Sequence, residues 1–241
     1  MPLSAPVFRL KRQARLLSRR DNIPLHTALD RIARAEGYRS WSHLSARASS
    51  DDSNPSWTSA ASDLLNRLNP GDMALLGARP GQGKTLLGLN LLTHAVRDRR
   101  VARFFTLEFT SPQTRDHLNR IDGDVADRVR IDSSDRISAD HVRTVMQDDP
   151  AGSVAVVDYL QLLDRRRETP PLDAQLSSLK AFAAQTGVIL VLLSQIDRHF
   201  DGCDGAMPGP ADIRRADPLD IAQFTKTCFL HGGRVHLPTA A

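Results

Sequence analysis

The sequence predicts an α/β protein with a mostly parallel sheet covered by helices on both faces, preceded by a small all-α segment. Two observations support this fold class. Short apolar strands alternate with helical patterns from about residue 57 onward, which is typical of strands joined by crossover helices. These strands are apolar at successive positions, as expected of strands that are buried on both faces. A chain of 241 residues can bury a core of this kind without disulfides.

The first part of the chain is predicted to be a basic helical module, residues 1–47, followed by a linker, residues 48–56. An apolar face at helical spacing begins after Pro24 and ends at Gly37. The basic stretch before it offers Leu16 and Leu17 for burial, and Trp41 could close a small core. Three short helices are predicted over residues 6–47, and the apolar positions of the second are Leu25, Ala28, Leu29, Ile32 and Ala33.

Residues 57–241 form the predicted sheet-containing domain, in which helix and strand patterns follow one another in order. The pattern gives a helix at 58–68, a strand at 73–77, a helix at 85–96, a strand at 101–107, a helix at 112–121 capped by Ser111, a strand at 129–131, a helix at 139–147, a strand at 154–157, a helix over about 172–183 and a strand at 188–193.

Charge is distributed unevenly along the sequence. Residues 1–50 carry ten Lys or Arg against three Asp or Glu, a net charge of +7, whereas the remaining 191 residues have a net charge of −3. This basic segment is compatible with nucleic-acid binding or with a docking or oligomerisation role. The longest apolar run, residues 188–193, is about a third of a bilayer span. The two cysteines and the absence of a signal-peptide pattern favour a cytoplasmic location.

A glycine-rich turn between a predicted strand and a predicted helix has the context of a phosphate-binding P-loop. Gly81 and Gly83 would let backbone N–H groups turn toward phosphate at a helix N-terminus. Lys84 would reach the β and γ phosphates, and the Thr85 hydroxyl would bind Mg²⁺. The predicted nucleotide-binding residues are Ala78, Arg79, Pro80, Gly81, Gln82, Gly83, Lys84, Thr85 and Leu86.

Polar side chains end three further strands, at the edge where open α/β sheets bind ligands. Asp158 follows an apolar strand and is suited to the Mg²⁺ shell, or else it caps the following turn. Glu108 could polarise a water for attack on the γ phosphate, or else it begins the next helix. Gln195 could sense the γ phosphate without adding charge.

The order of these motifs resembles the motor domain of the DnaB-type replicative helicases, a branch of the RecA-like P-loop ATPases. Ala78 replaces the first glycine of the general P-loop pattern, as in that branch. The similarity covers roughly residues 57–232. The matching stretches are PGDM at 70–73, GARPGQGKT at 77–85, FTLE at 105–108, VVDYLQL at 156–162, LSQIDR at 193–198 and DIR at 212–214.

The resemblance implies specific roles for several residues. It implies that Lys84 and Thr85 contact phosphate and Mg²⁺, that Asp158 holds Mg²⁺, that Glu108 is the catalytic base and that Gln195 is a coupling sensor. Candidate contacts to single-stranded DNA are Arg214 and Arg215, together with Arg165, Arg166 and Arg167, which could instead be a solvated loop.

Two regions depart from the family pattern. The basic segment takes the place of the family's helical collar, and it resembles a small helical module attached to plasmid and mobile-element proteins. The second such region is residues 232–241, where Arg234 is the one arginine that could act as an arginine finger toward a neighbouring subunit. His199 and Cys203 are too few to indicate a metal site.

The predicted function is therefore Mg²⁺-dependent ATP hydrolysis coupled to DNA unwinding or translocation. The expected cofactors are ATP and Mg²⁺, and the expected partners are single-stranded DNA and further copies of the chain in a hexamer-like ring, with no membrane. The alternative is a non-unwinding ATP-binding switch or assembly factor, because fold analogy alone does not separate the two.

Overall fold

The computed structural model describes residues 7–21, 23–44, 55–158, 170–197, 200, 207–214, 220–231 and 234–236. The chain divides into two compact units, Met1–Asn54 and Pro55–Ala241. The second unit begins with a helix at Pro55, two residues inside the segment predicted as linker. Among the described residues no helix is long and apolar enough to cross a bilayer.

The described part of the first unit contains helices α1 (Val7–Arg20) and α2 (Leu25–Ala35), with residues 41–44 also helical. Its small core joins Leu10, Ala33 and Leu44, with Trp41 packed against them. The expected burial of Leu16 was wrong, because its side chain is 58% exposed. The buried face of α1 includes Leu10 and positions four residues apart from it, which lie on the same side of the helix. Leu16 does not lie on that side.

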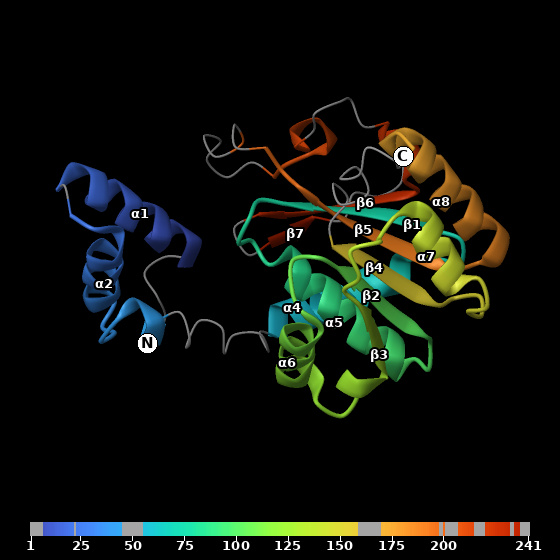
Figure 1. Ribbon diagram of the computed structural model, residues 1–241, viewed down its shortest axis with the longest axis horizontal. Helices are drawn as coiled ribbons and strands as arrows, with labels where there is room; N and C mark the ends of the chain where they lie inside the picture. The colour runs from blue at the N-terminus through green and yellow to red at the C-terminus, as the bar shows by residue number, and fades with distance from the viewer. Residues whose placement is uncertain are drawn as a thin grey trace. The chain divides into compact units, whose positions relative to one another are not determined.

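The second unit is built on a seven-stranded sheet (Figure 1). The strands are β1 (Met73–Ala78), β2 (Ala102–Thr106), β3 (Val129–Asp132), β4 (Val154–Asp158), β5 (Ile189–Gln195), β6 (Lys226–His231) and β7 (Arg234–His236). Their order is β3-β2-β4-β5-β1-β6-β7, and every pairing is parallel except that of β6 with β7. The predicted mostly parallel sheet is confirmed.

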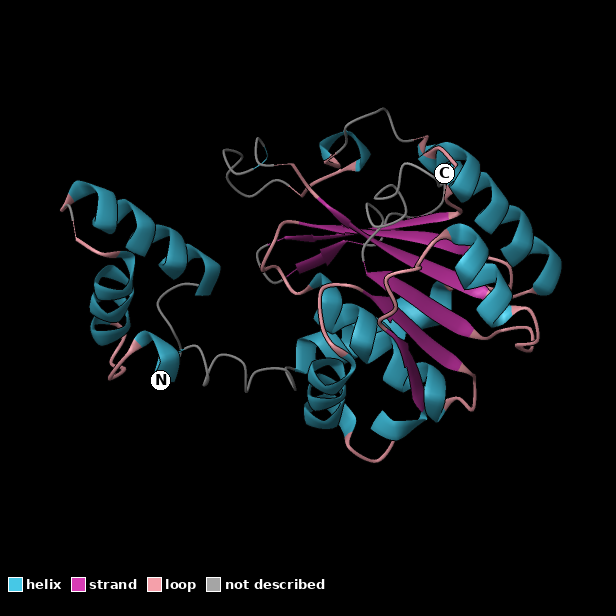
Figure 2. Ribbon diagram, in the orientation of Figure 1, coloured by secondary structure: helices cyan, strands magenta, loops and turns pink. Residues whose placement is uncertain are grey.

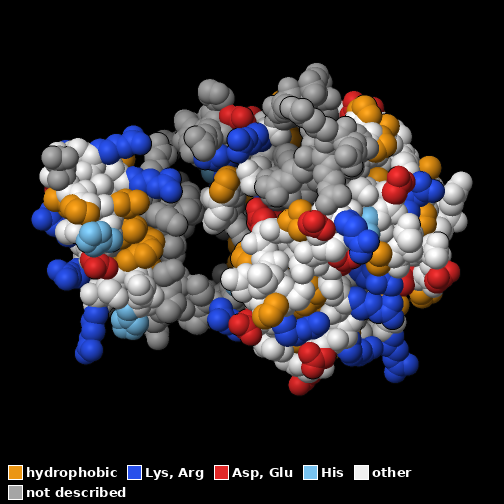
Figure 3. Space-filling view, viewed as in Figure 1, with side chains coloured by type: hydrophobic (Ala, Val, Ile, Leu, Met, Phe, Trp, Pro, Cys, Tyr) orange, Lys and Arg blue, Asp and Glu red, His pale blue; other side chains and the backbone are white. Residues whose placement is uncertain are grey.

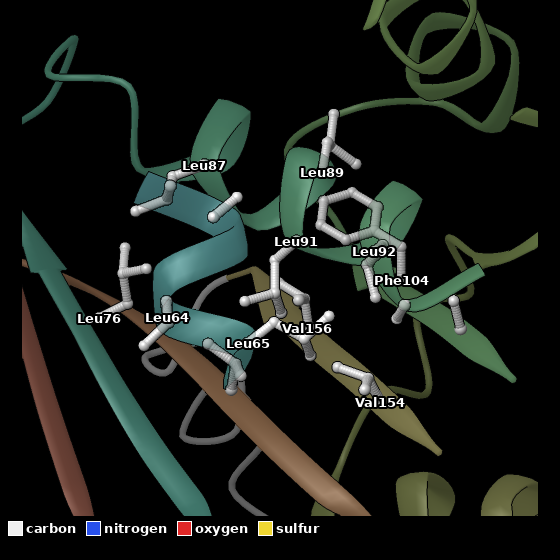
Figure 4. Close-up of a cluster of buried hydrophobic side chains, with 14 of the residues drawn as sticks. Leu64, Leu65, Leu76, Leu87, Leu89, Leu91, Leu92, Phe104, Val154 and Val156 are labelled. Atoms are coloured by element: carbon white, nitrogen blue, oxygen red, sulfur yellow. The ribbon is translucent and has the colours of Figure 1, made fainter. Parts of the chain in front are cut away.

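Helices cover both faces of this sheet, as predicted (Figure 2). The first face carries α4 (Pro55–Arg67), α5 (Lys84–Arg97) and α6 (Ser111–Asp122); the other face carries α7 (Ala139–Met146) and α8 (Leu172–Thr186). Leucines of α4 and α5 fill the first layer, where Leu64 and Leu65 lie near Leu87 and Leu91 (Figure 4). Each buried leucine contributes about 1.5–3 kcal/mol.

Helix α6 begins one residue earlier than the sequence predicts. Its N-cap is Thr110, whose hydroxyl accepts a hydrogen bond from the Gln113 N–H, while the Gln113 side chain accepts one from the Thr110 N–H. This reciprocal capping box satisfies two N–H groups that the helix leaves free. The predicted cap, Ser111, is instead the first helical residue, and its hydroxyl lies 2.9 Å from that of Ser133.

The register of the parallel strands aligns their carboxyl ends at one edge of the sheet. Ala78 is paired with Gln195, and Thr106 is paired with Asp158. Strands β5 and β4 lie between β1 and β2 in the sheet, so the connection from β1 to β2 crosses both of them. The direction in which successive strands are added to the sheet therefore changes within it. Open α/β sheets bind ligands at such a position.

Candidate functional site

The phosphate loop follows β1 directly and ends at the N-terminus of α5. Gly81 and Gly83 have φ values of +78° and +89°, a left-handed conformation that L side chains rarely adopt. Gly83 is the N-cap of α5, so the first backbone N–H groups of the helix, which point toward its N-terminus, follow immediately. The strand, turn and helix expected of a P-loop are therefore present.

Lys84 reaches two carboxylates that come from different strands. Its Nζ atom lies 2.7 Å from Oδ1 of Asp158 and 3.4 Å from Oε2 of Glu108. The Lys84 side chain is 7% exposed, the Asp158 side chain is fully buried, and the Glu108 side chain is 32% exposed. A buried carboxylate requires a compensating partner, and Lys84 supplies it here.

Thr85 completes the contact between the loop and β4. Its hydroxyl donates a 2.6 Å hydrogen bond to Oδ2 of Asp158. The hydroxyl and the carboxylate are both hard oxygen donors, the type that Mg²⁺ prefers. Because the two oxygens are adjacent and belong to the chain's phosphate loop and strand end, the residues fit a Mg²⁺ site beside bound phosphate.

Glu108 is held at the end of β2 by a residue that sequence reasoning missed. The Glu108 N–H donates a 3.1 Å hydrogen bond to the hydroxyl of Thr106, which is fully buried. This bond fixes the backbone two residues beyond the strand. A threonine at a strand end carries no distinctive sequence signal, since its β propensity alone explains it.

The third strand end, that of β5, contacts both the phosphate loop and the predicted DNA-facing stretch. Arg79 donates to the Ile196 carbonyl oxygen at 3.2 Å, which ties the loop to the residue after Gln195. Ile196 also forms an antiparallel bridge with Ile213. The Arg214 N–H donates to the Gln195 carbonyl oxygen at 2.7 Å, and its guanidinium lies 3.5 Å from the Gln195 side-chain oxygen.

Other residues singled out from the sequence are not part of this cluster. Arg165, Arg166, Arg167, Arg215, His199 and Cys203 lie outside the described residues. Arg234 is exposed in β7, which pairs with β6 and forms the edge of the described sheet. The structure thus brings together Lys84, Thr85, Asp158 and Glu108, and places Gln195 and Arg214 at a neighbouring strand end.

A histidine and an aspartate form a further contact at the end of β3. His141 Nε2 lies 2.7 Å from Oδ2 of Asp132, and the Ser134 N–H donates to Oδ1 at 2.9 Å. Burial acts to raise the pKa of Asp132, but the hydrogen bonds from His141 and Ser134 outweigh it and lower the pKa below the usual 3.8. Sequence reasoning did not single out this pair.

Comparisons with known proteins agree with the predicted resemblance. No protein-family model matches the chain. The chain is 24% identical over 186 residues to the replicative DNA helicase DnaB of Helicobacter pylori, and 24% identical over 198 residues to that of Mycoplasma pneumoniae. The alignments cover 63% and 65% of this chain but 38% and 42% of the helicases. The chain therefore spans about two fifths of the length of these curated relatives.

Two solved structures share the fold of the second unit. One is described as an ATPase domain and superposes with a TM-score of 0.58 at 19% identity, covering 73% of this chain and 75% of that chain. The other is a DnaB-like replicative helicase, described with its interactions with primase, and gives a TM-score of 0.55 at 19% identity, covering 66% and 47%. The sheet and the phosphate loop have the fold of the RecA-like P-loop class. Within this class, the comparisons confirm the resemblance to the motor domain of the DnaB-type replicative helicases.

Proposed function

We propose that the second unit hydrolyses ATP with Mg²⁺ and couples hydrolysis to movement along DNA or to unwinding. One observation carries this proposal: Lys84, Thr85 and Asp158 meet within 2.7 Å at the end of the phosphate loop, with Glu108 3.4 Å from the lysine. A cation, a hydroxyl and two carboxylates at the N-terminus of a helix are the groups that phosphoryl transfer requires.

The proposed roles follow from the position of each group. The N–H groups around Gly81 and Gly83 bind the phosphates, and Lys84 neutralises charge that develops on them. Thr85 and Asp158 hold Mg²⁺, which supplies charge stabilisation when it is bound. Other predicted loop residues, from Ala78 to Leu86, shape the same cradle.

Glu108 is the proposed catalytic base. It accepts a proton from a water molecule as the water oxygen bonds to the γ phosphorus and the bond to the β-phosphate oxygen breaks, which leaves ADP and phosphate. The Thr106 hydrogen bond holds the Glu108 backbone, so the carboxylate extends from a fixed strand end. Its partial exposure leaves it accessible to water.

Coupling to DNA is proposed to pass through the end of β5. Gln195 senses the γ phosphate, and the Ile196–Ile213 bridge and the Arg214 N–H bond connect it to Arg214. Arg214 would contact a phosphate of single-stranded DNA, together with the other predicted arginines. Similarity to replicative DNA helicases supports this substrate and supports assembly into a hexamer-like ring, in which Arg234 is a candidate finger.

The test is the ATP hydrolysis rate of the full chain with and without single-stranded DNA, measured beside the particle mass in ATP. A translocating motor predicts Mg²⁺-dependent turnover that DNA stimulates and a mass of several chains. ATP binding without DNA-stimulated turnover would contradict the motor and favour the ATP-binding switch. Arg214→Gln should lose DNA stimulation while it keeps the basal rate.

A further inference from the structure

The phosphate loop is contacted by a tryptophan from a different helix. A Cβ atom built on Gly83 would lie 2.9 Å from Cζ2 and 3.3 Å from Cη2 of Trp57, and 3.4 Å from Cε2. The indole of Trp57 therefore covers Gly83 on the side where a side chain would stand. Gly83 is the residue directly before Lys84 and adopts the left-handed conformation at the start of α5.

The helix that carries Trp57 is fixed to α5 near this contact. The Thr58 hydroxyl donates to the Asn90 side-chain oxygen at 3.3 Å, and Asn90 in turn donates to the Leu86 carbonyl oxygen at 2.9 Å. His94 Nε2 lies 3.0 Å from the Thr58 carbonyl oxygen. Asn90 is fully buried, whereas Thr58 and its contact with His94 are exposed, so the bonds that hold the first turn of α4 against α5 run from the surface into the core.

The apolar face of α4 provides a second, deeper attachment. Its buried positions are Ala61, Leu64 and Leu65, and with Leu68, the residue after the helix, they lie in the same core layer as the leucines of α5 (Figure 4). Trp57 is only partly buried and stands one turn before this face. The buried leucines thus anchor the helix, and the partly buried indole of Trp57 packs against the edge of the same core.

We propose that Trp57 is a positioning residue of the nucleotide site. Gly83 has no side chain to restrain its own backbone, and a glycine at positive φ exchanges easily with other conformations. The indole restrains it, so that the N–H groups at the start of α5 and the Lys84 side chain are in place before phosphate binds. Preorganised groups bind more tightly because less order is lost on binding. This inference rests on the ATP binding proposed above.

A kinetic comparison separates positioning from a purely structural role. Trp57→Ala should raise the KM for ATP about tenfold, with kcat within about threefold of wild type, because the ring acts before the chemical step. Trp57→Phe should restore most of the loss, since a phenyl ring retains an aromatic contact. The matched control is Trp41→Ala, which removes the other tryptophan, in the first unit, and should leave the KM unchanged.

The two tryptophans of the chain also allow a spectroscopic test. Trp41→Phe leaves Trp57 as the sole indole, and its emission should change saturably as ATP is added. The change should disappear when Lys84→Ala is added to that protein. Trp57→Phe, which retains only Trp41, should show no ATP-dependent change.

Equilibrium dialysis of ATP against the wild-type chain is performed first. Absence of binding overturns the proposed function and this inference with it. Binding with wild-type affinity by Trp57→Ala, or an unresponsive Trp57 in a protein that binds ATP, overturns only the inference. Circular dichroism and thermal unfolding check the fold, and Trp57→Leu carries the same test if the alanine variant does not fold.

Discussion

The two units of the chain use their charges in different ways. In the second unit two of the charges proposed to do chemistry, those of Lys84 and Asp158, are buried and bonded to each other, and Glu108 beside them is partly exposed. In the described part of the first unit, charged groups such as Arg15 and Arg19 are exposed, and the core is small. Figure 3 shows Lys and Arg side chains at the surface of this unit. Buried charges are costly unless they are paired, so their arrangement is specific to one site. Exposed charges define only an electrostatic surface.

This difference determines which experiments are informative for each unit. In the second unit each single substitution should have its own effect on ATP binding or turnover, because each buried charged group contacts a specific side chain. In the first unit, with its net charge of +7 over residues 1–50, effects should scale with the number of charges removed. Substitutions in each unit test this contrast.

Lys84→Ala is expected to have the largest effect. It removes the cation from the phosphates and leaves the buried Asp158 without its charged partner. ATP turnover should fall by at least about 10²-fold, the scale seen when one charge-stabilising donor is removed. The control is Lys180→Ala, because Lys180 bonds the Ala222 carbonyl oxygen away from the loop and should be dispensable for turnover. Equal loss in both variants would contradict the site.

Glu108→Gln should slow hydrolysis by about 10²-fold and leave ATP bound, because the amide cannot accept the proton of the attacking water. Turnover and equilibrium binding are measured on the same preparation. Asp132→Asn is the matched control, since Asp132 ends the neighbouring strand and is bonded to His141. Normal turnover in Glu108→Gln would contradict the role of Glu108 as the catalytic base.

Removing surface charge tests the first unit. The triple variant Arg15→Gln, Arg19→Gln and Arg34→Gln removes three exposed charges. If the unit binds single-stranded DNA, the slope of log affinity against log salt should become shallower by up to about 2. Deletion of residues 1–50 should flatten it further.

The control for the triple arginine variant makes three Arg→Gln substitutions in the second unit. The control set is Arg67→Gln, Arg120→Gln and Arg128→Gln, all exposed. This variant should keep the wild-type slope. If the first-unit variants also keep that slope but assemble less well, the first unit docks subunits and does not bind DNA.

The Asp132–His141 contact should give the smallest effect. Because the pKa of Asp132 is lowered in the folded protein, the contact stabilises the fold above the ordinary pKa of 3.8. This contribution is lost as the pH falls through the lower folded-state pKa. Asp132→Asn should cost under about 1 kcal/mol of unfolding free energy near neutral pH, and less in acid. Urea unfolding of both proteins measures this loss of unfolding free energy. A loss that grows toward acid pH would contradict the stabilising role of the contact.

Much of the second unit was predictable from sequence because strand ends and the glycine-rich turn carry local signals. Asp158 and Gln195 follow apolar runs, and the parallel register then brings strand ends to one edge. Contacts between distant segments have no such signal. Trp57 reaches Gly83, and Arg79 reaches Ile196, through packing that only the folded chain creates. The exposure of Leu16 has a local cause instead, because Leu16 lies off the buried face of α1.

The first unit was less predictable, because short basic helices are compatible with several functions. The spacing of apolar residues predicts helices in this unit. The residues on the exposed faces of these helices do not identify a binding partner. The boundary near Pro55 was displaced because proline is tolerated in the first turn of a helix. Predicted functions of this unit and of the arginines outside the described residues remain predictions.

The central claim is that the second unit binds ATP through the phosphate loop and the strand ends beside it. Calorimetric titration of ATP into the full chain, with and without Mg²⁺, tests it most directly when wild type and Lys84→Ala are compared. The account predicts saturable binding by wild type, tighter with Mg²⁺, and loss of binding in Lys84→Ala. No binding by wild type, or equal binding by both proteins, would contradict it.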